Sequence, residues 1–390
     1  MHVLVIGAGV FGAWTALWLR RRGASVTLVD QYGPGNALSS SGDESRVTRS
    51  AHGPDELYPR WQRRALEQWL ELDPSLFVRT GVAWFVGADD RFERDSLDVL
   101  DRLGIPAERL EPDAAARRWP QIDLTGVRWV LHEPEAGALL ARRAVAAVAA
   151  RFVAEGGELR IGRAAFDQDG VVIELDGEVT GFDAVVLALG PWLPAFVARS
   201  GDLRPSTLRR LELKVTRQEV VYFATPPGDP RFDAGRHPIW VEHGASIYGL
   251  PSIEHRGFKV APDWPGPEVD PDTQDRRLTD EMVGAARAYL RRRFPVLAEQ
   301  PVAEGRVCQY ELTADTHFII DRLVPELGAW VVGGGSGHGF KHGPVVGELL
   351  SGLIVGANVA DLAPPDDRFA LRDRSPSTGV RTAGTSPDAA

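Results

Sequence analysis

The sequence contains little sulfur, with one cysteine, Cys308, and two methionines in 390 residues. A single cysteine excludes an intramolecular disulfide, so the fold depends on its apolar core, and a reducing compartment is the natural setting. No apolar run reaches the roughly 20 residues needed to cross a bilayer. The start, MHVLVIGAG, lacks the basic segment and the cleavage site of a signal peptide. These absences predict a cytoplasmic protein that does not enter the membrane.

Positive charge is also in short supply. The chain has 44 Lys and Arg against 54 Asp and Glu, a net charge of -10. This balance argues against a nucleic-acid partner, which requires a basic face. The chain is 44% hydrophobic and 25% charged, as in ordinary globular enzymes. Since 390 residues exceed the usual size of one core, we expect two domains.

The first 30 residues carry a nucleotide-binding pattern. Residues 2–6 are continuously apolar, as in a central parallel strand, and Gly7, Gly9 and Gly12 follow in G-x-G-x-x-G spacing. These glycines allow a tight turn, close approach of a pyrophosphate and close helix packing, with the phosphates at the helix N-terminus. Residues 13–22 continue a helix, 25–29 form a second strand, and Asp30 at its end suits a ribose with free hydroxyls. The site predicts FAD or NAD without choosing between them.

A polar loop follows, where a nicotinamide enzyme would usually continue with another strand and helix. It spans residues 31–53 and contains Arg46 and Arg49. If residues 44–51 form a helical turn, both guanidinium groups share one face. That face is either solvated or forms a cationic wall near a cofactor ring or a substrate carboxylate.

Later segments indicate a discontinuous flavin domain. Residues 182–196 form a buried strand that ends at Gly190 and is followed by Trp192, and 210–265 alternate as antiparallel strands do. We predict an α/β and α+β fold: a Rossmann-like FAD-binding domain with a mixed antiparallel-sheet substrate domain. The predicted FAD-binding domain comprises residues 1–85, 140–205 and 305–362, and the substrate domain 86–139 and 206–304. Residues 363–390 have little apolar content and are predicted to be a disordered tail, in particular beyond Leu371.

A second strand, glycine turn and helix occurs near the C-terminus. Residues 331–333 form the strand, and 344–354 the helix. The turn is GGGSGHGFK, in which Gly337, His338, Gly339 and Phe340 precede Lys341. Its backbone can lie against a flat ring. In isolation Lys341 is compatible with a surface lysine, and Cys308 with a small hydrophobe in a buried strand.

Taken together, four motifs resemble the monomeric sarcosine oxidase and N-methyltryptophan oxidase group of the D-amino-acid-oxidase-like flavoproteins. They are the glycine motif with Asp30, the loop GDESRVTRSAHG, the segment CQYELTADTHFIID and the turn SGHGFK. The resemblance runs from residue 3 to about residue 360. It implies FAD as cofactor, a secondary amino acid as substrate, O₂ as electron acceptor with release of hydrogen peroxide, and a monomer.

The resemblance also implies roles for individual residues. Cys308 matches a cysteine bonded to the flavin 8α-methyl carbon, and Arg49 and Lys341 match a pair that binds the substrate carboxylate. Lys259 matches a lysine that assists reaction with O₂, where a fixed cation stabilises developing negative charge. The remaining matches are Tyr248 in the substrate pocket, Arg46 near the flavin ring, and Ser41 and the residues of the turn 337–341 against the cofactor.

Two positions depart from the family pattern. Ser40 and Ser41 stand where histidines usually precede the GD of the loop, which has one extra residue, and Asp263 stands near an expected histidine. An anionic Asp263 favours a cationic amine, which opposes oxidation unless the carboxylate accepts a proton. Alternatively it points away and Trp264 shapes the cavity. These departures favour N-methyl-amino acids, L-pipecolate or L-proline as alternatives to sarcosine.

Two other functions are compatible with the same residues. A flavin dehydrogenase would pass electrons to a quinone or a partner protein instead of O₂. A flavin-binding protein without turnover, or a tRNA-modifying flavoprotein, is the other alternative, although the acidic charge disfavours RNA.

Overall fold

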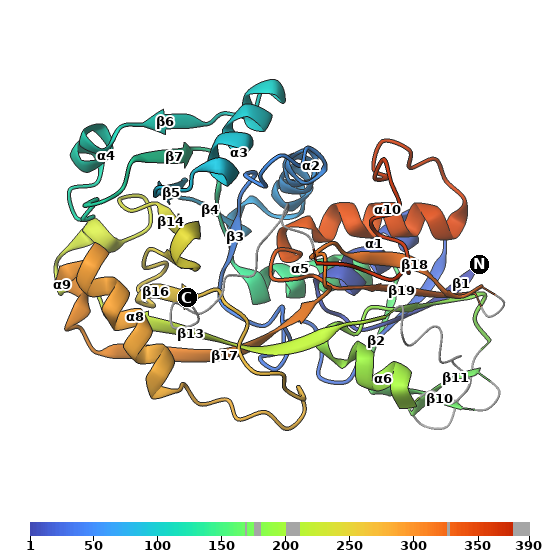
Figure 1. The fold of residues 1–390 in the computed structure, drawn as a ribbon. Coiled ribbons are helices and arrows are strands. Elements are labelled where there is room, and N and C mark those ends of the chain that lie inside the picture. Colours follow the sequence, from blue (N-terminus) through green and yellow to red (C-terminus); the bar gives the residue numbers. More distant parts are fainter. Residues whose placement is uncertain (168–169, 175–180, 200–210, 326–327, 377–390) are drawn as a thin grey trace.

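The computed structural model describes residues 1–167, 170–174, 181–199, 211–325 and 328–376. Two sheets organise these residues into two lobes that lie side by side (Figure 1). Neither lobe is a continuous piece of chain, because strands far apart in the sequence pair within each sheet.

The first lobe contains a six-stranded sheet among the described residues. Its order is β18 (Ile319–Val324), β19 (Ala329–Gly333), β12 (Ala184–Leu187), β1 (His2–Ile6), β2 (Ser25–Asp30) and β9 (Glu158–Ile161). All neighbours are parallel except β18 and β19. Both faces of β1 are buried, which explains its unbroken apolar run: Val3 and Val5 pack into one core, and Leu4 and Ile6 into another.

Helices α1 (Val10–Arg21), α5 (Ala141–Ala154) and α10 (Gly343–Val355) cover one face of this sheet (Figure 1). Two glycines permit the close packing of α1. A Cβ on Gly12 would lie 1.8 Å from the Gly7 carbonyl oxygen, and one on Gly347 would lie 2.6 Å from the backbone of Trp14. The other face carries α6 (Leu193–Arg199). α2 (Leu57–Leu72) packs beside α10.

The second lobe contains an eight-stranded sheet among the described residues. Its order is β17 (Val302–Leu312), β13 (Lys214–Phe223), β16 (Phe258–Pro262), β15 (Ile247–Leu250), β14 (Ile239–Glu242), β5 (Val82–Val86), β7 (Trp129–Glu133) and β6 (Glu108–Leu110). Only the β14–β5 pairing is parallel. Its alternating strands bury one face against α8 (Asp280–Arg293) and α9 (Pro295–Ala298). The short helices α3 (Arg91–Arg102) and α4 (Pro112–Arg118) lie near its β6 edge.

A small sheet lies between the lobes, with the order β3 (Arg46–Thr48), β8 (Gly137–Leu139) and β4 (Phe77–Arg79). The helical turn considered for residues 44–51 is therefore wrong at its centre, because β3 pairs with β8 in an extended conformation. β10 (Arg163–Asp167) and β11 (Gly170–Glu174) form a separate hairpin.

The lobes differ from the predicted domain boundaries in two strands. Residues 305–312 were assigned to the FAD-binding domain, yet β17 pairs with β13 in the eight-stranded sheet. Residues 82–85 were also assigned there, but β5 pairs with β14 and β7. In both cases the strand joins the sheet in which its side chains pack against those of neighbouring strands, although these strands are distant in the sequence.

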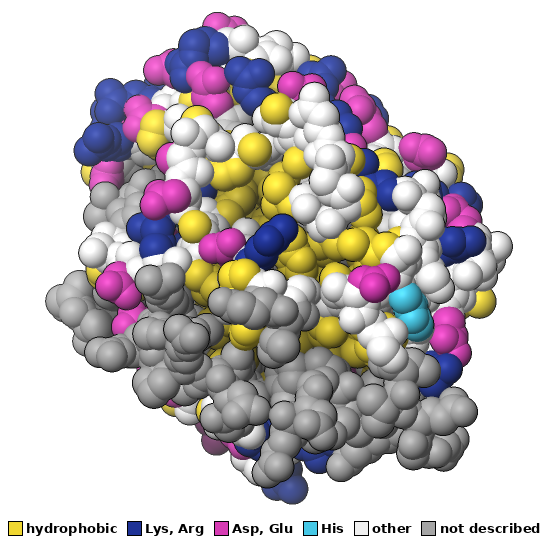
Figure 2. Space-filling view, turned by 90° about the vertical axis from the view of Figure 1, so that its right-hand side faces the viewer, with side chains coloured by type: hydrophobic (Ala, Val, Ile, Leu, Met, Phe, Trp, Pro, Cys, Tyr) yellow, Lys and Arg dark blue, Asp and Glu magenta, His cyan; other side chains and the backbone are white. Residues whose placement is uncertain are grey.

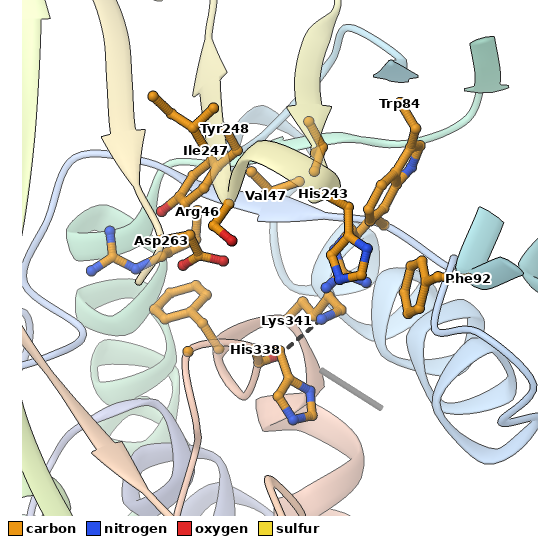
Figure 3. A pocket seen from close by; sticks show the side chains of 15 residues that line it. Arg46, Val47, Trp84, Phe92, His243, Ile247, Tyr248, Asp263, His338 and Lys341 are labelled. Carbon is orange, nitrogen blue, oxygen red and sulfur yellow. Dashed lines mark hydrogen bonds between the residues drawn. The ribbon is translucent and has the colours of Figure 1, made fainter. Parts of the chain in front are cut away.

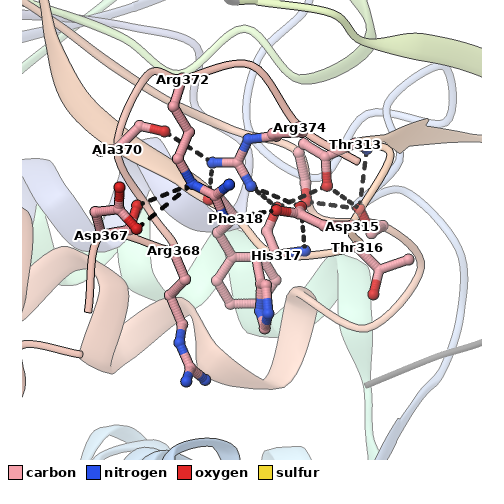
Figure 4. A network of polar contacts seen from close by, with 12 residues as sticks. Thr313, Asp315, Thr316, His317, Phe318, Asp367, Arg368, Ala370, Arg372 and Arg374 are labelled. Atoms are coloured by element: carbon pink, nitrogen blue, oxygen red, sulfur yellow. Dashed lines mark hydrogen bonds and ion pairs between the residues drawn. The ribbon is translucent and has the colours of Figure 1, made fainter. Parts of the chain in front are cut away.

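The C-terminal segment also differs from the sequence prediction. Residues 363–376 are ordered against the first lobe, and residues 377–390 lie outside the described part of the chain. Phe369 is buried, and Arg372 and Arg374 both form ion pairs with Asp315 (Figure 4). The segment has few apolar residues, but it is ordered because the buried Asp315 carboxylate binds two of its arginines.

The molecular surface at the right-hand side of Figure 1 is hollowed. Figure 2 shows hydrophobic side chains inside the hollow and charged side chains of both signs around it. Within the described residues, no helix combines the length and the apolarity required to span a membrane.

The Asp315 network predicts a difference between two neighbouring arginines. Arg374 is 1% exposed and lies 2.7 Å from Asp315, whereas Arg372 is 34% exposed. Arg374→Ala should lower the free energy of unfolding by about 3 kcal/mol, because a buried ion pair is broken on one side. Arg372→Ala should cost less than about 1 kcal/mol. Denaturant titration of both variants measures this, and equal losses would contradict the assignment.

Candidate active site

Three cavities follow one another between the glycine motif and the gap between the lobes. The glycine-motif cavity is lined by Gly7, Gly9 and Asp30, and its empty volume, including its mouth, is about 770 Å³. The cysteine cavity is lined by Cys308 and Glu311, and its volume on the same measure is about 710 Å³. The arginine cavity, with about 840 Å³ including its mouth, lies furthest from the glycine motif. Adjoining cavities share lining residues: Gly9, Ser40, Ser41, Ala188 and Gly190 for the first two, and Arg46, Gly337 and Phe340 for the last two.

The glycine-motif cavity has the features required for a dinucleotide. Gly7 has φ +104°, and Gly9 is the N-cap of α1 without a capping side chain. A Cβ on Gly9 would meet only the Ser41 hydroxyl, at 3.5 Å, so the backbone there is open to the cavity. The Asp30 carboxylate accepts the N–H groups of Ala8, Tyr32 and Gly33 at 2.7–2.9 Å. Burial raises the pKa of Asp30 despite these hydrogen bonds.

The cysteine cavity brings Cys308 to its wall. The strand β17 carries this residue, and its sulfur lies 3.5 Å from the Arg46 Nη2 atom and 3.8 Å from the Ser40 carbonyl oxygen. Glu311 lies in the same wall, fully buried, and accepts the Gly334 N–H at 2.9 Å. Burial raises the pKa of Glu311 to about 7.

A buried ion-pair network lies beside the cysteine cavity. The Asp43 carboxylate accepts from Lys259 Nζ at 2.6 Å and from the Arg46 guanidinium, and the Tyr222 hydroxyl lies 3.2 Å from it. Burial opposes the ionised form of Asp43, but Lys259 and Arg46 outweigh it and lower its pKa. Burial also lowers the pKa of Lys259, a shift that Asp43 partly offsets. Two cations therefore share one anion next to the cavity.

The arginine cavity combines two cations with an apolar wall (Figure 3). The Arg49 guanidinium lies 5.0 Å from the Trp84 ring centre, and Lys341 Nζ donates to the His338 carbonyl oxygen at 2.9 Å. Asp263 also lines the cavity and accepts the Tyr310 hydroxyl at 2.8 Å. Apolar contact comes from a wall formed by Val47, Trp84, Phe92, Val241, Ile247 and the ring of Tyr248. Such a cavity suits an anion that carries an apolar substituent.

Three buried histidines adjoin this cavity: His52, His338 and His342. One ring nitrogen of each lies within 4.8 Å of the others, a spacing found in metal sites. His52 Nδ1 contacts the Ser50 carbonyl oxygen and His338 Nε2 the Thr316 carbonyl oxygen, both at 2.9 Å. Burial, and then Lys341 and Arg49, hold the pKa of His52 well below its usual value. The same positive charges oppose a metal dication, so we interpret the cluster as neutral packing behind Lys341.

The structure brings most of the predicted site residues to these cavities. Those lining at least one of the three are Gly7, Gly9, Asp30, Ser41, Arg46, Arg49, Gly190, Trp192, Tyr248, Asp263, Cys308, Gly337, His338, Gly339, Phe340 and Lys341. Gly12 lines none of them, because it packs α1 against the turn. Lys259 lines a separate, smaller cavity.

Several residues of the site escaped the sequence prediction. Asp43, Tyr222 and Glu311 are polar residues that only the fold places beside Arg46 or Cys308. His52 and His342 are separated by 290 positions in the chain, so spacing alone gives no sign of their cluster. Asp43 had one available signal, since it belongs to the GD of the loop that the family resemblance contains.

The fold and the three cavities define a dinucleotide-binding protein with a second lobe beside the dinucleotide site. Comparison with known proteins agrees. The sequence model of the family described as DAO, FAD dependent oxidoreductase, matches residues 2–353. The chain belongs to this family of FAD-dependent oxidoreductases, which confirms the resemblance found in the sequence and decides between FAD and NAD.

Individual relatives cover almost the whole chain. Monomeric sarcosine oxidase of Streptomyces avermitilis is 30% identical over 376 residues, 92% of this chain and 94% of its own. N-methyl-L-tryptophan oxidase of Salmonella dublin is 26% identical over 378 residues, 93% and 97% of the two chains. The solved structure of L-proline dehydrogenase from P. horikoshii has a TM-score of 0.78 at 21% identity, with 93% and 95% covered. This last likeness shows a shared fold.

Glu311 predicts a pH dependence of stability. Burial raises the pKa of its carboxyl group to about 7 in the folded protein, whereas the pKa is about 4.3 in the unfolded chain. The folded state therefore retains a proton that the unfolded state loses between these pH values, and stability falls as pH rises through this window. For the wild type this group should account for a loss on the order of 3 kcal/mol between pH 5 and 8. Glu311→Gln should remove that loss in denaturant titrations, and an unchanged pH profile would contradict the assignment.

Proposed function

We propose that this protein is an FAD-dependent oxidase of secondary amino acids that reduces O₂ to hydrogen peroxide. The observation that carries this proposal is the arginine cavity, in which Arg49 and Lys341 lie beside an apolar wall next to the cysteine cavity. The names of the relatives, monomeric sarcosine oxidase and N-methyl-L-tryptophan oxidase, support the same substrate class.

The residues present fit FAD. The open backbone at Gly9 and the anchored Asp30 suit the pyrophosphate and the ribose, and the cysteine cavity provides room for the ring beside Cys308. When bound, FAD would supply the electron acceptor for oxidation of the substrate C–N bond. Glycines of the turn 333–339 allow its backbone to approach a flat ring. Arg46, which lines both the cysteine and the arginine cavities, would lie at the junction of cofactor and substrate.

Arg49 and Lys341 would bind the substrate carboxylate. Both cations line the arginine cavity, and their positive charges favour an anion there. The carboxylate contact fixes the orientation of the rest of the molecule.

Asp263 would contact the substrate amine. It lines the arginine cavity and accepts the Tyr310 hydroxyl, so the alternative in which it points away from the cavity is not adopted. A carboxylate at this position can accept the amine N–H or its proton, leaving the neutral amine that oxidation requires. Tyr310, in turn, orients the carboxylate.

The substrate would carry a bulky apolar group. Trp84, Phe92 and Ile247 provide an apolar surface in the same cavity as the two cations. N-methyl derivatives of aromatic or branched amino acids therefore fit better than sarcosine.

Lys259 supports O₂ as the acceptor. Its ammonium group is fixed by Asp43 beside Arg46, and a fixed cation near the reduced cofactor stabilises negative charge that develops on oxygen. A monomer in the cytoplasm is the setting that the single thiol and the family resemblance support.

A peroxide assay with two lysine variants tests the proposal. Peroxide release should be faster with N-methyl-L-tryptophan or N-methyl-L-leucine than with sarcosine. Lys341→Met should raise KM at least about tenfold, because a charged hydrogen bond contributes about 1.5–3 kcal/mol. Lys214→Met, at a position 73% exposed on β13, is the matched control and should leave KM unchanged. Equal effects of both variants, or no peroxide with any of these amines, would contradict the proposal.

Cys308 predicts a covalent flavin. Joining its sulfur to the flavin 8α-methyl carbon removes two hydrogen atoms, for which O₂ is the final acceptor. Acid precipitation of the purified protein should therefore leave the yellow colour in the pellet. The variant Cys308→Ala should release all colour to the supernatant, since the sequence has no other thiol. Colour that stays with the variant pellet would exclude Cys308 as the attachment site.

A further inference from the structure

A fourth cavity approaches the site from a different side of the molecule. This lysine cavity has an empty volume of about 370 Å³ including its mouth, and Lys259 lines it. Among the described residues, none that lines it also lines the glycine-motif, cysteine or arginine cavity. The function of Lys259 described above does not require a cavity here, so this space calls for its own explanation.

The mouth of the lysine cavity is charged. Arg143 of α5 and Glu254 of the turn between β15 and β16 form an ion pair there, with side chains 55% and 47% exposed. Arg256 adds ion pairs to Glu44 at 3.2 Å and to Glu304 at 3.0 Å. These pairs hold the turn against α5 and against Glu44 of the polar loop formed by residues 31–53. They present no electrostatic barrier to a small uncharged molecule.

The interior is apolar until it reaches the ammonium group. Leu140, Pro251 and Ile253 line the space, and all three are buried. Tyr222, Ser45 and Lys259 line its inner end, and Lys259 is 1% exposed. An apolar passage that ends at a fixed buried cation suits a ligand that enters neutral and gains negative charge at the end.

The inner end lies close to the cysteine cavity through a short chain of contacts. Lys259 Nζ contacts Asp43 at 2.6 Å, Asp43 binds the Arg46 guanidinium, and Arg46 Nη2 lies 3.5 Å from the Cys308 sulfur. Arg46 also lines the arginine cavity, where the substrate is proposed to bind. A molecule in the lysine cavity therefore reaches the Lys259 side of this ion-pair network without crossing the space in which the substrate is proposed to bind.

We propose that the lysine cavity is the passage by which O₂ reaches Lys259 and by which hydrogen peroxide leaves. This inference rests on the proposed function, since it requires O₂ to be the acceptor. In the balanced step, O₂ takes two electrons and two protons, which derive from the oxidised C–N bond of the substrate, and becomes H₂O₂. The separate passage allows this step while the imine product still occupies the arginine cavity.

Narrowing the passage tests the proposal. Ile253→Trp fills the apolar interior, and Ile253→Phe fills it in part. His255→Trp is the matched control, because it adds the same ring to the same turn at an exposed residue that does not line the cavity. The two half-reactions are followed separately by flavin absorbance: anaerobic reduction by an N-methyl-amino acid, and reoxidation by O₂ at several concentrations.

The second-order rate constant for reoxidation should fall about tenfold in Ile253→Trp, a change of the size that restricted access produces, and less in Ile253→Phe. Anaerobic reduction should stay within about twofold of the wild type in both variants, as should both steps in His255→Trp. Reoxidation at the wild-type rate in Ile253→Trp would overturn the proposal. If the reduced wild-type protein is stable in air, the proposed oxidase function itself fails, which is a distinguishable result.

Xenon provides a readout that does not depend on activity. It is apolar and of similar size to O₂, so crystals of the wild-type protein under xenon pressure should show a xenon atom between Leu140 and Ile253. Crystals of Ile253→Phe should lack it and those of His255→Trp should retain it. If Ile253→Trp folds poorly, this comparison of xenon binding still tests the proposed passage. No xenon in the wild-type passage would overturn the proposal.

Discussion

The Asp43 carboxylate is the constraint on which the rest of the site depends. It is buried, and it holds Arg46 of β3 and Lys259 of β16, so it joins the small central sheet to the eight-stranded sheet. Removing the anion would leave two buried cations without their partner, which costs several kcal/mol. With the anion present, a net positive charge remains between the cysteine, arginine and lysine cavities. That charge would favour the anionic species that the proposed substrate binding and O₂ reduction involve.

Burial and a second pair of cations, Lys341 and Arg49, set the protonation of neighbouring groups. Burial and the charges of Lys341 and Arg49 keep the His52 and His342 rings neutral, so the cluster does not add repulsion next to the carboxylate site. Glu311 lies in the cysteine cavity, where burial raises its pKa to about 7 and favours the uncharged form in acid. Asp263 lines the same cavity as Lys341 (Figure 3) and is the acid proposed to contact the substrate amine. The cavity thus carries charges of both signs, as the proposed binding of an amino acid requires.

The sequence was enough to predict the elements whose structure depends on neighbouring residues. The first strand, the turn at Gly7 and the helix α1 follow from glycine spacing and apolar runs within 30 residues. The prediction was wrong where contacts between distant residues determine the structure. Residues 46–48 are extended because β8 pairs with them, although their sequence allows a helical turn. Residues 363–376 are ordered because Asp315, more than 50 positions earlier, binds two of their arginines. The Asp43–Lys259 contact spans 216 positions, so only the fold reveals that the lysine is held in place.

This chain is proposed to pass electrons from a secondary amino acid to O₂ through bound FAD. The most direct test mixes the purified yellow protein with N-methyl-L-tryptophan under anaerobic conditions and then admits a known amount of O₂. In the first step the flavin should be reduced completely, so its absorbance at about 450 nm should be lost. The second step should restore the absorbance with one peroxide formed per flavin. A flavin that stays oxidised with the amine, or a reduced flavin that persists in air, would contradict the proposed oxidase function.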